Sequence, residues 1–310
     1  TAIRRLNEQS LVLKVCGLAT DDARAAYKTS SFDFRNYKRL KMFLHAEAVN
    51  DANDLQDGEL GAFIRLGSDF NNNYYEFEIP LEVTPWGENL DTEVWPENNE
   101  LDLEFELLQL AKQDRNLAVA MGLHESNNVP YSTLDGRVTV RGNPNLSAVK
   151  TIMLGVRNLK ENGETVCGEV WFNELRLTDF DEYGGWATNA RVNGRLADFA
   201  NVNIAGNMST VGFGSIEQKL QERQKYNARQ YDIASTFSLD KFFPEETGLK
   251  VPLYVGVSEA VKDPHYNPLD PDITLSKSLD NLETKAEKDE LKNIVQDYTS
   301  RKSINLSNVR

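Results

Sequence analysis

Apolar and polar residues alternate one by one through much of this 310-residue chain, and a period of two is the pattern of β-strands with one buried face. The clearest case runs from Tyr75 to Val83. The same alternation occurs at 11–15, 40–46, 60–66, 138–140 and 152–156, and the segment 166–177 is apolar on both phases, as in a central strand. Many short strands joined by turn residues predict a mainly β protein, and for residues 1–183 a jelly-roll-like β-sandwich.

One helix is predicted within this part of the chain, over residues 99–116. Asn99 is a suitable N-cap, and leucines recur at helical spacing after it. The first leucines of the segment also alternate with polar residues, so a strand remains an alternative at its start.

The excess of acidic residues lies in the first part of the chain. The sequence carries 48 Asp and Glu against 34 Lys and Arg, a formal net charge of −14. Residues 1–183 hold 31 of these acidic and 18 of these basic residues, whereas residues 184–310 are almost neutral. This asymmetry predicts two domains, 1–183 and 184–310, joined at Gly184-Gly185. An acidic chain without a basic cluster also predicts no nucleic-acid partner.

Beyond Gly185 the alternation continues in longer segments. Four strands are predicted around 190–196, 202–209, 231–239 and 249–257, and a fifth opens at Ile304. The sequence holds no run of 18 or more apolar residues, which excludes a membrane helix. Strands of about 9–11 residues cross a bilayer when tilted. Residues 184–310 are therefore predicted to form antiparallel hairpins of a transmembrane β-barrel, with a second soluble sheet as the alternative.

The connections between these strands differ in length. Those at 197–201 and 240–248 are short, and those at 211–229 and 259–302 are long. Outer-membrane barrels have short periplasmic turns and long extracellular loops. We therefore expect an outer-membrane location with residues 1–183 on the extracellular side.

Both long connections are predicted to contain helices. A capping-box sequence at Ser215 predicts a short charged helix to about Tyr226, and amphipathic spacing predicts one or two helices in the second connection.

The polar phase of these strands is the candidate functional surface. In a barrel the apolar phase faces lipid and the polar phase faces the lumen. The predicted lumen-facing residues are Arg191, Asn193, Arg195, Asn203, Asn207 and Ser209. Five strands cannot close a barrel, and open sheet edges in lipid leave backbone groups unpaired. We therefore expect the chain to be part of a longer protein.

Seven segments carry a family resemblance. They are VWFNELRLTDFDEYGGWATNARV (170–192), TVGFGSIEQKLQER (210–223), FFPEETG (242–248), HYNPLDPDI (265–273), VQDYTSRKSINLSNVR (295–310), FDFRNYKRLKMFLHAE (32–47) and GSDFNNNYYEFEIPL (67–81). They resemble the SprA/Sov family of outer-membrane translocons of the type IX secretion system. The resemblance implies export of folded cargo proteins, and a role in gliding motility where that occurs. It also implies as partners secreted cargo proteins, a smaller outer-membrane barrel that acts as a shuttle, a plug protein, and membrane lipid or lipopolysaccharide.

The two cysteines are candidates for a disulfide. Cys16 and Cys167 lie near the first and last strands of the predicted sandwich, and export would place them in an oxidising compartment. Two buried thiols are the alternative.

One acidic loop is a weak candidate for calcium. Asp51, Asp54, Asp57 and Glu59 offer hard oxygen ligands within a few residues of each other. Their spacing departs from the EF-hand pattern, and a solvated charge run is the alternative. The glutamates Glu76, Glu78 and Glu82 are interpreted as the solvent-facing side of a strand.

No catalytic motif is present in the sequence. His45, His124 and His265 are far apart, which does not predict a zinc site. Gly212-Phe213-Gly214 lacks the remaining residues of a phosphate loop. We expect no enzymatic activity, no catalytic residue, no metal and no cofactor.

The alternative function is that of an extracellular carbohydrate-binding β-sandwich module. Trp86 or Trp95 would then offer an aromatic platform to a glycan. A glycosidase accessory domain is a further alternative, and it requires two carboxylates facing each other in a cleft.

Overall fold

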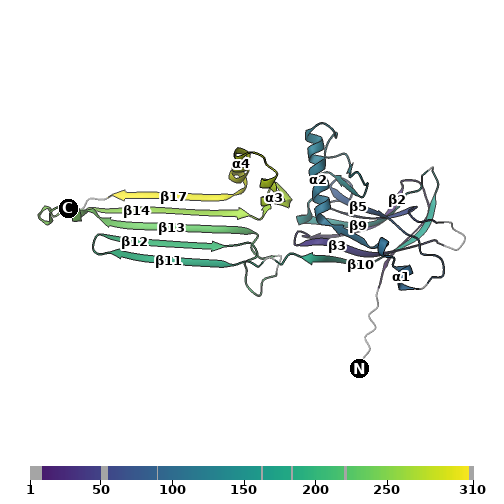
Figure 1. The fold of residues 1–310 in the computed structure, drawn as a ribbon, viewed down its shortest axis with the longest axis horizontal. Helices are drawn as coiled ribbons and strands as arrows, with labels where there is room; N and C mark the ends of the chain where they lie inside the picture. Colours follow the sequence, from purple (N-terminus) through teal and green to yellow (C-terminus); the bar gives the residue numbers. More distant parts are fainter. Residues whose placement is uncertain are drawn as a thin grey trace, which may run out of the picture. The chain divides into compact units, whose positions relative to one another are not determined.

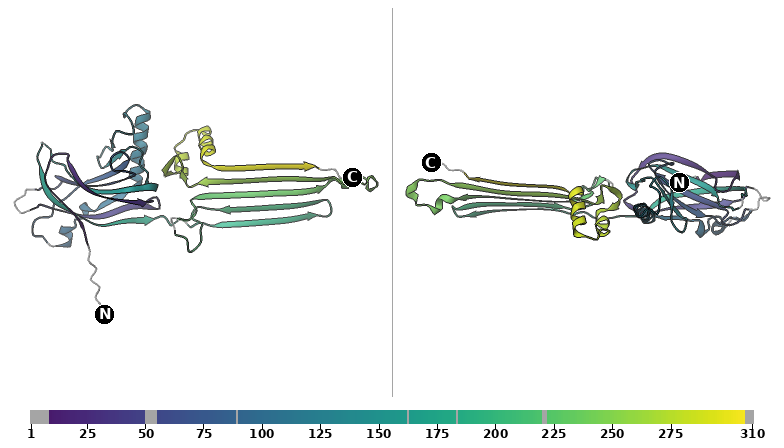
Figure 2. Two further views of the ribbon diagram at one scale, coloured as in Figure 1. Left: turned by 180° about the vertical axis from the view of Figure 1, so that it is seen from behind. Right: turned by 90° about the horizontal axis from the view of Figure 1, so that it is seen from above.

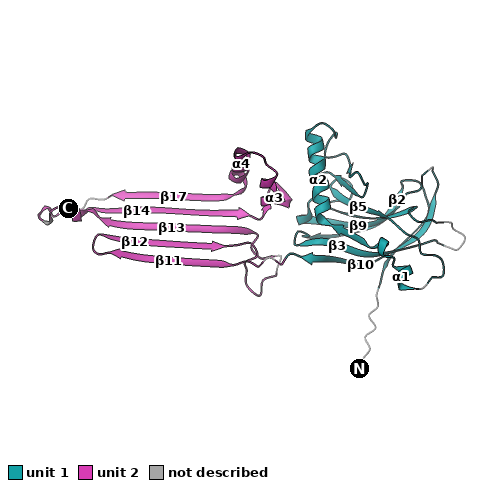
Figure 3. Ribbon diagram, in the orientation of Figure 1, with its two compact units in different colours: residues 1–181 teal, residues 182–310 magenta. Residues whose placement is uncertain are grey.

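The computed structural model describes residues 9–49, 55–88, 90–161, 163–182, 184–219 and 222–306. The chain divides into two compact units, residues 1–181 and residues 182–310 (Figure 3). Both units consist mainly of β-strands, and their paired strands are antiparallel. The mainly β character predicted from the alternation is therefore confirmed.

The N-terminal unit contains two antiparallel sheets (Figure 1). The four-stranded sheet has the order β1 (Leu11–Leu18), β10 (Val166–Phe180), β3 (Tyr37–Glu47) and β6 (Leu101–Glu104). The six-stranded sheet has the order β2 (Ala23–Phe32), β9 (Val149–Asn158), β4 (Leu60–Gly67), β5 (Tyr74–Pro80), β8 (Val138–Arg141) and β7 (Tyr131–Ser132). The unit also contains the helices α1 (Asp91–Val94) and α2 (Phe105–Ala120) and the short 3-10 helices η1 (Glu97–Asn99) and η2 (Leu146–Ala148).

The hydrophobic core of this unit forms from one apolar face of each sheet. Leu40 and Leu44 of β3 are fully buried, as are Ile64 and Leu66 of β4, and all four belong to one cluster. The segment 166–177 lies in β10, between β1 and β3. A central position explains why that segment is apolar on both phases.

Strand β2 is not predicted by the alternation. Its sequence ARAAYKTSSF contains few large apolar residues, and its side chains are half-buried or exposed. The strand lies at the edge of the six-stranded sheet beside β9. Backbone pairing, rather than burial of an apolar face, fixes its position.

The helix predicted over 99–116 begins later, at Phe105. Leu101 and Leu103 instead form β6, which pairs with β3, and both side chains are fully buried there. A strand buries both leucines on one face, because its period is two. The helix then continues to Ala120.

The acidic residues of β5 do not form the solvent-facing side expected of them. Glu76 is only 4% exposed, and its carboxylate binds the guanidinium groups of Arg65 and Arg157. Arg157 Nη1 also lies 2.6 Å from Glu78 Oε2. The guanidinium of Arg157 lies over the Phe63 ring, 5.0 Å from its centroid. Arginines from β4 and β9 therefore neutralise this face and allow it to be buried.

Burial raises the pKa of the Glu78 carboxyl above its ordinary value of 4.5, although the neighbouring Arg157 lowers it. The folded protein therefore holds this proton more tightly than the unfolded chain does. The contribution of Glu78 to the free energy of unfolding is full below pH 4.5 and is lost as the pH rises through the raised pKa.

Glu78→Gln is expected to remove this pH dependence. The free energy of unfolding of the wild type minus that of the variant, measured by urea denaturation from acidic to neutral pH, should decrease as the pH rises. A difference that increases with pH would contradict the prediction, because it would mean that pairing with Arg157 lowers the pKa of Glu78 in the folded protein.

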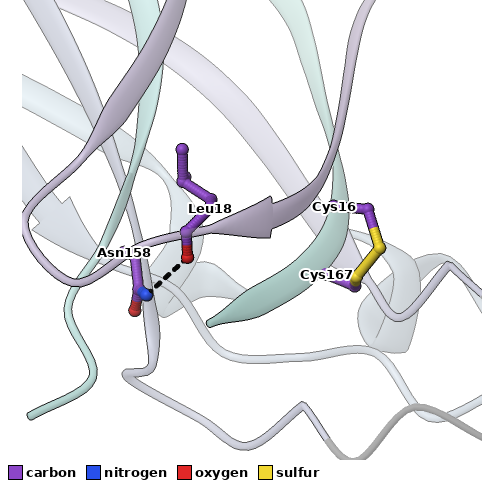
Figure 4. The surroundings of a disulfide bond; sticks show 4 residues. All are labelled: Cys16, Leu18, Asn158 and Cys167. Carbon is purple, nitrogen blue, oxygen red and sulfur yellow. Dashed lines mark hydrogen bonds between the residues drawn. A yellow bond between two sulfur atoms is a disulfide. The ribbon is translucent and has the colours of Figure 1, made fainter. Parts of the chain in front are cut away.

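Cys16 and Cys167 form a disulfide between the neighbouring strands β1 and β10 (Figure 4). Their Cα atoms are 3.9 Å apart, and 151 residues separate them in the sequence. Nearby, the side-chain amide of Asn158 donates a hydrogen bond to the Leu18 carbonyl at 2.8 Å (Figure 4). The first and last strands of the unit are thus linked covalently, and β9 is tied to the end of β1.

Replacing both cysteines with serine is expected to lower the free energy of unfolding of this unit by about 2–5 kcal/mol, because the bond restricts the unfolded chain. Guanidinium unfolding followed by the fluorescence of Trp95 and Trp171 measures the change. Wild-type protein with reductant is the control, and it should unfold at the same denaturant concentration as the double variant. If the double variant and the reduced wild type both unfold at the denaturant midpoint of the oxidised wild type, the disulfide does not stabilise the unit.

The C-terminal unit is built on a five-stranded antiparallel sheet (Figure 1). Its strands follow the order β11 (Ala187–Leu196), β12 (Ala200–Ser209), β13 (Tyr226–Ser238), β14 (Pro252–Pro264) and β17 (Asp297–Leu306). Its other elements are η4 (Leu239–Phe242), η5 (Glu245–Thr247), the hairpin of β15 (Tyr266–Asn267) and β16 (Asp270–Thr274), and the helices α3 (Leu275–Asp280) and α4 (Lys285–Val295). The five long strands form a single layer (Figure 2). Within the described ranges, no helix has the length and apolar character needed to cross a membrane.

The strands of this sheet are longer than the alternation predicts. The first long connection, predicted at 211–229, spans 210–225, and the second, predicted at 259–302, spans 265–296. The fifth strand likewise begins before Ile304. At these strand ends polar residues occur on both faces of the sheet, so the sequence shows no alternation there. The backbone hydrogen bonds between neighbouring strands nevertheless continue.

The helix predicted from the capping-box sequence at Ser215 does not form, since the described residues of 210–225 contain no α-helix. The backbone N–H of Gly212 instead donates to the Gln224 carbonyl at 2.8 Å, which draws the two ends of the connection together. The helices predicted in the second connection do form, and α4 begins with a capping box at Thr284.

Candidate functional site

The C-terminal sheet has two chemically different faces. In antiparallel pairing, residues directly opposite each other lie on the same face. One such row, taken from β11 to β17, consists of Asn193, Asn203, Ala234, Gly256 and Ser303. The adjacent row on the opposite face consists of Val192, Ile204, Ile233, Val257 and Lys302.

The first face is polar across all five strands. Its polar and charged side chains include Asn189, Asn201, Gln230, Asp232, Thr236, Ser258, Lys262, Asp297, Thr299, Arg301 and Asn305. The structure also brings the six predicted residues together on this face, namely Arg191, Asn193, Arg195, Asn203, Asn207 and Ser209. All are exposed except Ser209, which is half-buried and bonds to the amide of Gln224 at 2.9 Å. We call this surface the polar face.

The opposite surface, the apolar face, carries aliphatic and aromatic side chains. They are Val192, Leu196, Val202, Ile204, Met208, Ile233, Phe237, Leu253, Val255, Val257, Ile304 and Leu306. Several are largely exposed, with fractions of 61% for Val192, 42% for Ile204 and 77% for Ile304. A contiguous apolar surface of this kind marks contact with lipid or with another protein.

The apolar face changes character near the long connections. Arg229, Tyr231, Glu259 and Tyr298 occupy its positions there. Both tyrosine hydroxyls donate to the Glu259 carboxylate, at 2.5 Å for Tyr298. Helix α4 lies beside this group, and Lys292 helps to line the cleft of about 710 Å³ between them. Sequence reasoning missed the group, although a charged residue at position 229 on the apolar phase was an available signal.

Aromatic side chains lie at both ends of the sheet. At the end with the short connections, the Phe199 ring contacts those of Phe237 and Phe242, with centroids 5.9 and 5.4 Å apart. At the end with the long connections, Trp186 and Phe213 are both exposed. Aromatic residues thus occur beyond both ends of the strands.

The acidic loop proposed for calcium is described only in part. Asp51 and Asp54 lie outside the described residues. Asp57 Oδ1 accepts a hydrogen bond from the Val83 backbone N–H at 2.7 Å, and Glu59 lies 3.0 Å from Lys160 Nζ. These two carboxylates therefore have partners within the protein.

Among the residues that the structure describes, no three His, Cys, Asp or Glu side chains gather as a metal site requires. His45 lies in β3, His124 follows α2, and His265 follows β14. The three histidines thus occupy separate parts of the fold.

Comparison with known proteins identifies the family of the chain. The model of the family SprA_N, described as motility related/secretion protein, matches residues 1–279. A search of the curated proteins finds no match. The match extends through the N-terminal unit and most of the C-terminal sheet, so the chain belongs to the SprA N-terminal family of motility-related and secretion proteins.

Proposed function

We propose that the C-terminal sheet forms part of the wall of a protein-conducting channel in the outer membrane, within the type IX secretion system that the family resemblance implies. The observation that carries the proposal is the pairing of a polar face that extends across all five strands with an apolar face that extends from β11 to β14 and, on β17, is interrupted by Lys302. The polar face lines a hydrated path for folded cargo proteins, and the apolar face contacts lipid. Conduction is passive and uses no catalytic residue.

The strand dimensions support this proposal. Strands of 10 to 13 residues are long enough for a tilted crossing, which needs about 9–11 residues. The apolar rows lie in the half of the sheet near the short connections, and Tyr231 and Tyr298 follow toward the long ones. Tyrosines and other aromatic residues mark the interfaces of outer-membrane barrels, so the order of side chains along the strands fits a membrane crossing.

The lengths of the connections assign an orientation. The connections of 210–225 and 265–296 lie at one end of the sheet, and the turn between Leu196 and Ala200 lies at the other, together with the connection 239–251, which was predicted shorter, at 240–248. At each end the connections differ in length, and those at the first end are the longer ones. Long loops are extracellular in such barrels. Because β11 starts at the end with the long connections, we assign the N-terminal unit to the extracellular side.

The strand order of the N-terminal unit supports its assignment as a jelly roll. Eight strands have the orders β1-β10-β3-β6 and β2-β9-β4-β5, and the β8-β7 hairpin extends the second sheet. Strands from the beginning and end of the unit are therefore neighbours in both sheets, as in a double Greek key. This acidic sandwich frames the channel exit in the proposal.

The same proposal assigns partners to the protein. They are secreted cargo, the smaller outer-membrane barrel that acts as a shuttle, the plug protein, and membrane lipid or lipopolysaccharide. The outer edges of β11 and β17 also need pairing strands inside a membrane, because lipid cannot satisfy backbone hydrogen bonds. The family resemblance also implies a role in gliding motility where that occurs.

Lysine substitutions on a single strand test which face contacts lipid. Val202→Lys and Ile204→Lys are expected to reduce assembly in the outer membrane, since a charge at the midplane costs about 2–4 kcal/mol on the lipid side. Asn203→Lys lies between them on the polar face and is the matched control, which should assemble normally. The measurement is the amount of protein in the outer-membrane fraction, and equal amounts for all three variants would contradict the proposal.

Cysteine labelling tests whether the polar face is in contact with water. Asn203→Cys in the assembled protein should react rapidly with a membrane-impermeant maleimide, because water stabilises the reactive thiolate and apolar surroundings disfavour it. Ile204→Cys should react much more slowly. The native cysteines form a disulfide and give no background. Faster labelling of Ile204→Cys than of Asn203→Cys would reverse the assignment of the two faces.

A further inference from the structure

An aromatic row crosses the outer face of the four-stranded sheet in the N-terminal unit. Trp171 of β10 lies opposite His45 of β3, and their ring centroids are 4.7 Å apart. Trp95, just after α1, lies 6.0 Å from His45 and 6.3 Å from Phe43, measured between ring centroids. These four rings form a row on the side of the sheet that faces away from the core.

Trp95 is held in place by hydrogen bonds at the end of α1. The Thr84 hydroxyl donates to the Glu93 carbonyl at 2.8 Å, and His45 Nδ1 lies 2.9 Å from the Val94 carbonyl. His45 is itself 98% buried, which fixes the position of its ring. The Trp95 ring is therefore positioned before any ligand binds, and this lowers the entropic cost of binding.

Trp95 and Phe43 form part of a cleft of about 320 Å³. Its remaining lining residues all carry groups that form hydrogen bonds, namely Asp91, Thr92, Asn173 and Glu174. Ligand sites combine an aromatic surface with a few polar groups in this way, and their volumes range over about 300–1,000 Å³. The cleft is at the small end of that range.

A β-bulge places Glu174 at the cleft. The pairing of β10 with β3 shifts register between Asn173 and Arg176, and Glu174 has a φ of +51°. A positive φ is strained for any residue other than glycine, and residues with strained backbone angles cluster at binding sites. The bulge turns the Glu174 side chain away from the regular alternation of the strand.

The charges around the cleft disfavour an anionic ligand. Asp91 and Glu174 contribute two carboxylates to its lining. The nearby guanidinium of Arg176 lies over the Phe43 ring, 4.3 Å from its centroid, and is paired with Glu174 and Glu100 at 3.1 and 2.9 Å. The positive charge is therefore compensated, and the carboxylates repel an anionic ligand.

We infer that this cleft binds one ring of a neutral saccharide. The apolar face of a pyranose stacks on Trp95, and its hydroxyls donate to the carboxylates of Asp91 and Glu174 and to the amide oxygen of Asn173. The small volume suits a single sugar ring. This inference rests on the N-terminal unit alone and does not depend on the channel proposal.

Titration of the protein with neutral methyl glycosides tests the inference. The probes are methyl β-glucoside, methyl α-mannoside and methyl β-N-acetylglucosaminide, with methyl β-glucuronide as the anionic comparison. At least one neutral probe should quench tryptophan fluorescence saturably, and Trp95→Ala should weaken its binding by at least about tenfold. Trp86→Ala is the matched control, because Trp86 is 56% exposed and does not line the cleft, and it should bind as the wild type does.

Asp91→Ala provides a second variant in case Trp95→Ala disturbs folding, since Asp91 is exposed on α1. It should also weaken binding while leaving the denaturant midpoint of the protein unchanged. The inference is wrong if no neutral glycoside binds, if the glucuronide binds more tightly than all of them, or if Asp91→Ala and Trp95→Ala both bind as the wild type does.

Discussion

The C-terminal sheet buries almost none of its own apolar side chains, and the interpretation of the structure depends on this. Among the described residues of the C-terminal unit, the buried hydrophobic ones are Ala200 and Val261 in the sheet and Ile273 and Leu275 outside it, whereas the N-terminal unit has an extensive core. Because strand side chains alternate, a single-layer sheet with one apolar face needs an apolar environment on that side only. Lipid on one side and water on the other satisfy both faces.

The fold was predictable wherever an apolar face is buried or continuous. Alternation located β3, β4 and β5 and most of β11 and β12, since each presents a regular apolar phase. Alternation did not predict strands that are held by backbone pairing and lack a regular apolar face, as in β2 and at the ends of β13 and β14. It was ambiguous at Leu101 and Leu103, where two periods fit the same residues and pairing with β3 favoured the strand.

The candidate site was predictable only within single strands and their nearest hairpin. The six residues of the polar face on β11 and β12 lie together because a tight turn fixes the register of that hairpin. The contact of Tyr231 with Glu259 depends on the register of β13 with β14, and that of Tyr298 depends on the register of β14 with β17. The connections 239–251 and 265–296 separate these strand pairs in the sequence. The burial of Glu76 similarly depends on Arg157, which lies 81 residues later in the sequence.

The distribution of charge distinguishes the two units in a way that suits a conducting wall. The polar face carries charges of both signs, and bases outnumber acids; they are Arg191, Arg195, Lys262 and Arg301, with Asp232 and Asp297. A path with one strong sign would retain cargo of the opposite sign, because charged walls concentrate their counter-ions. A wall on which both signs occur weakens this retention. The acidic excess of the chain lies in the N-terminal unit.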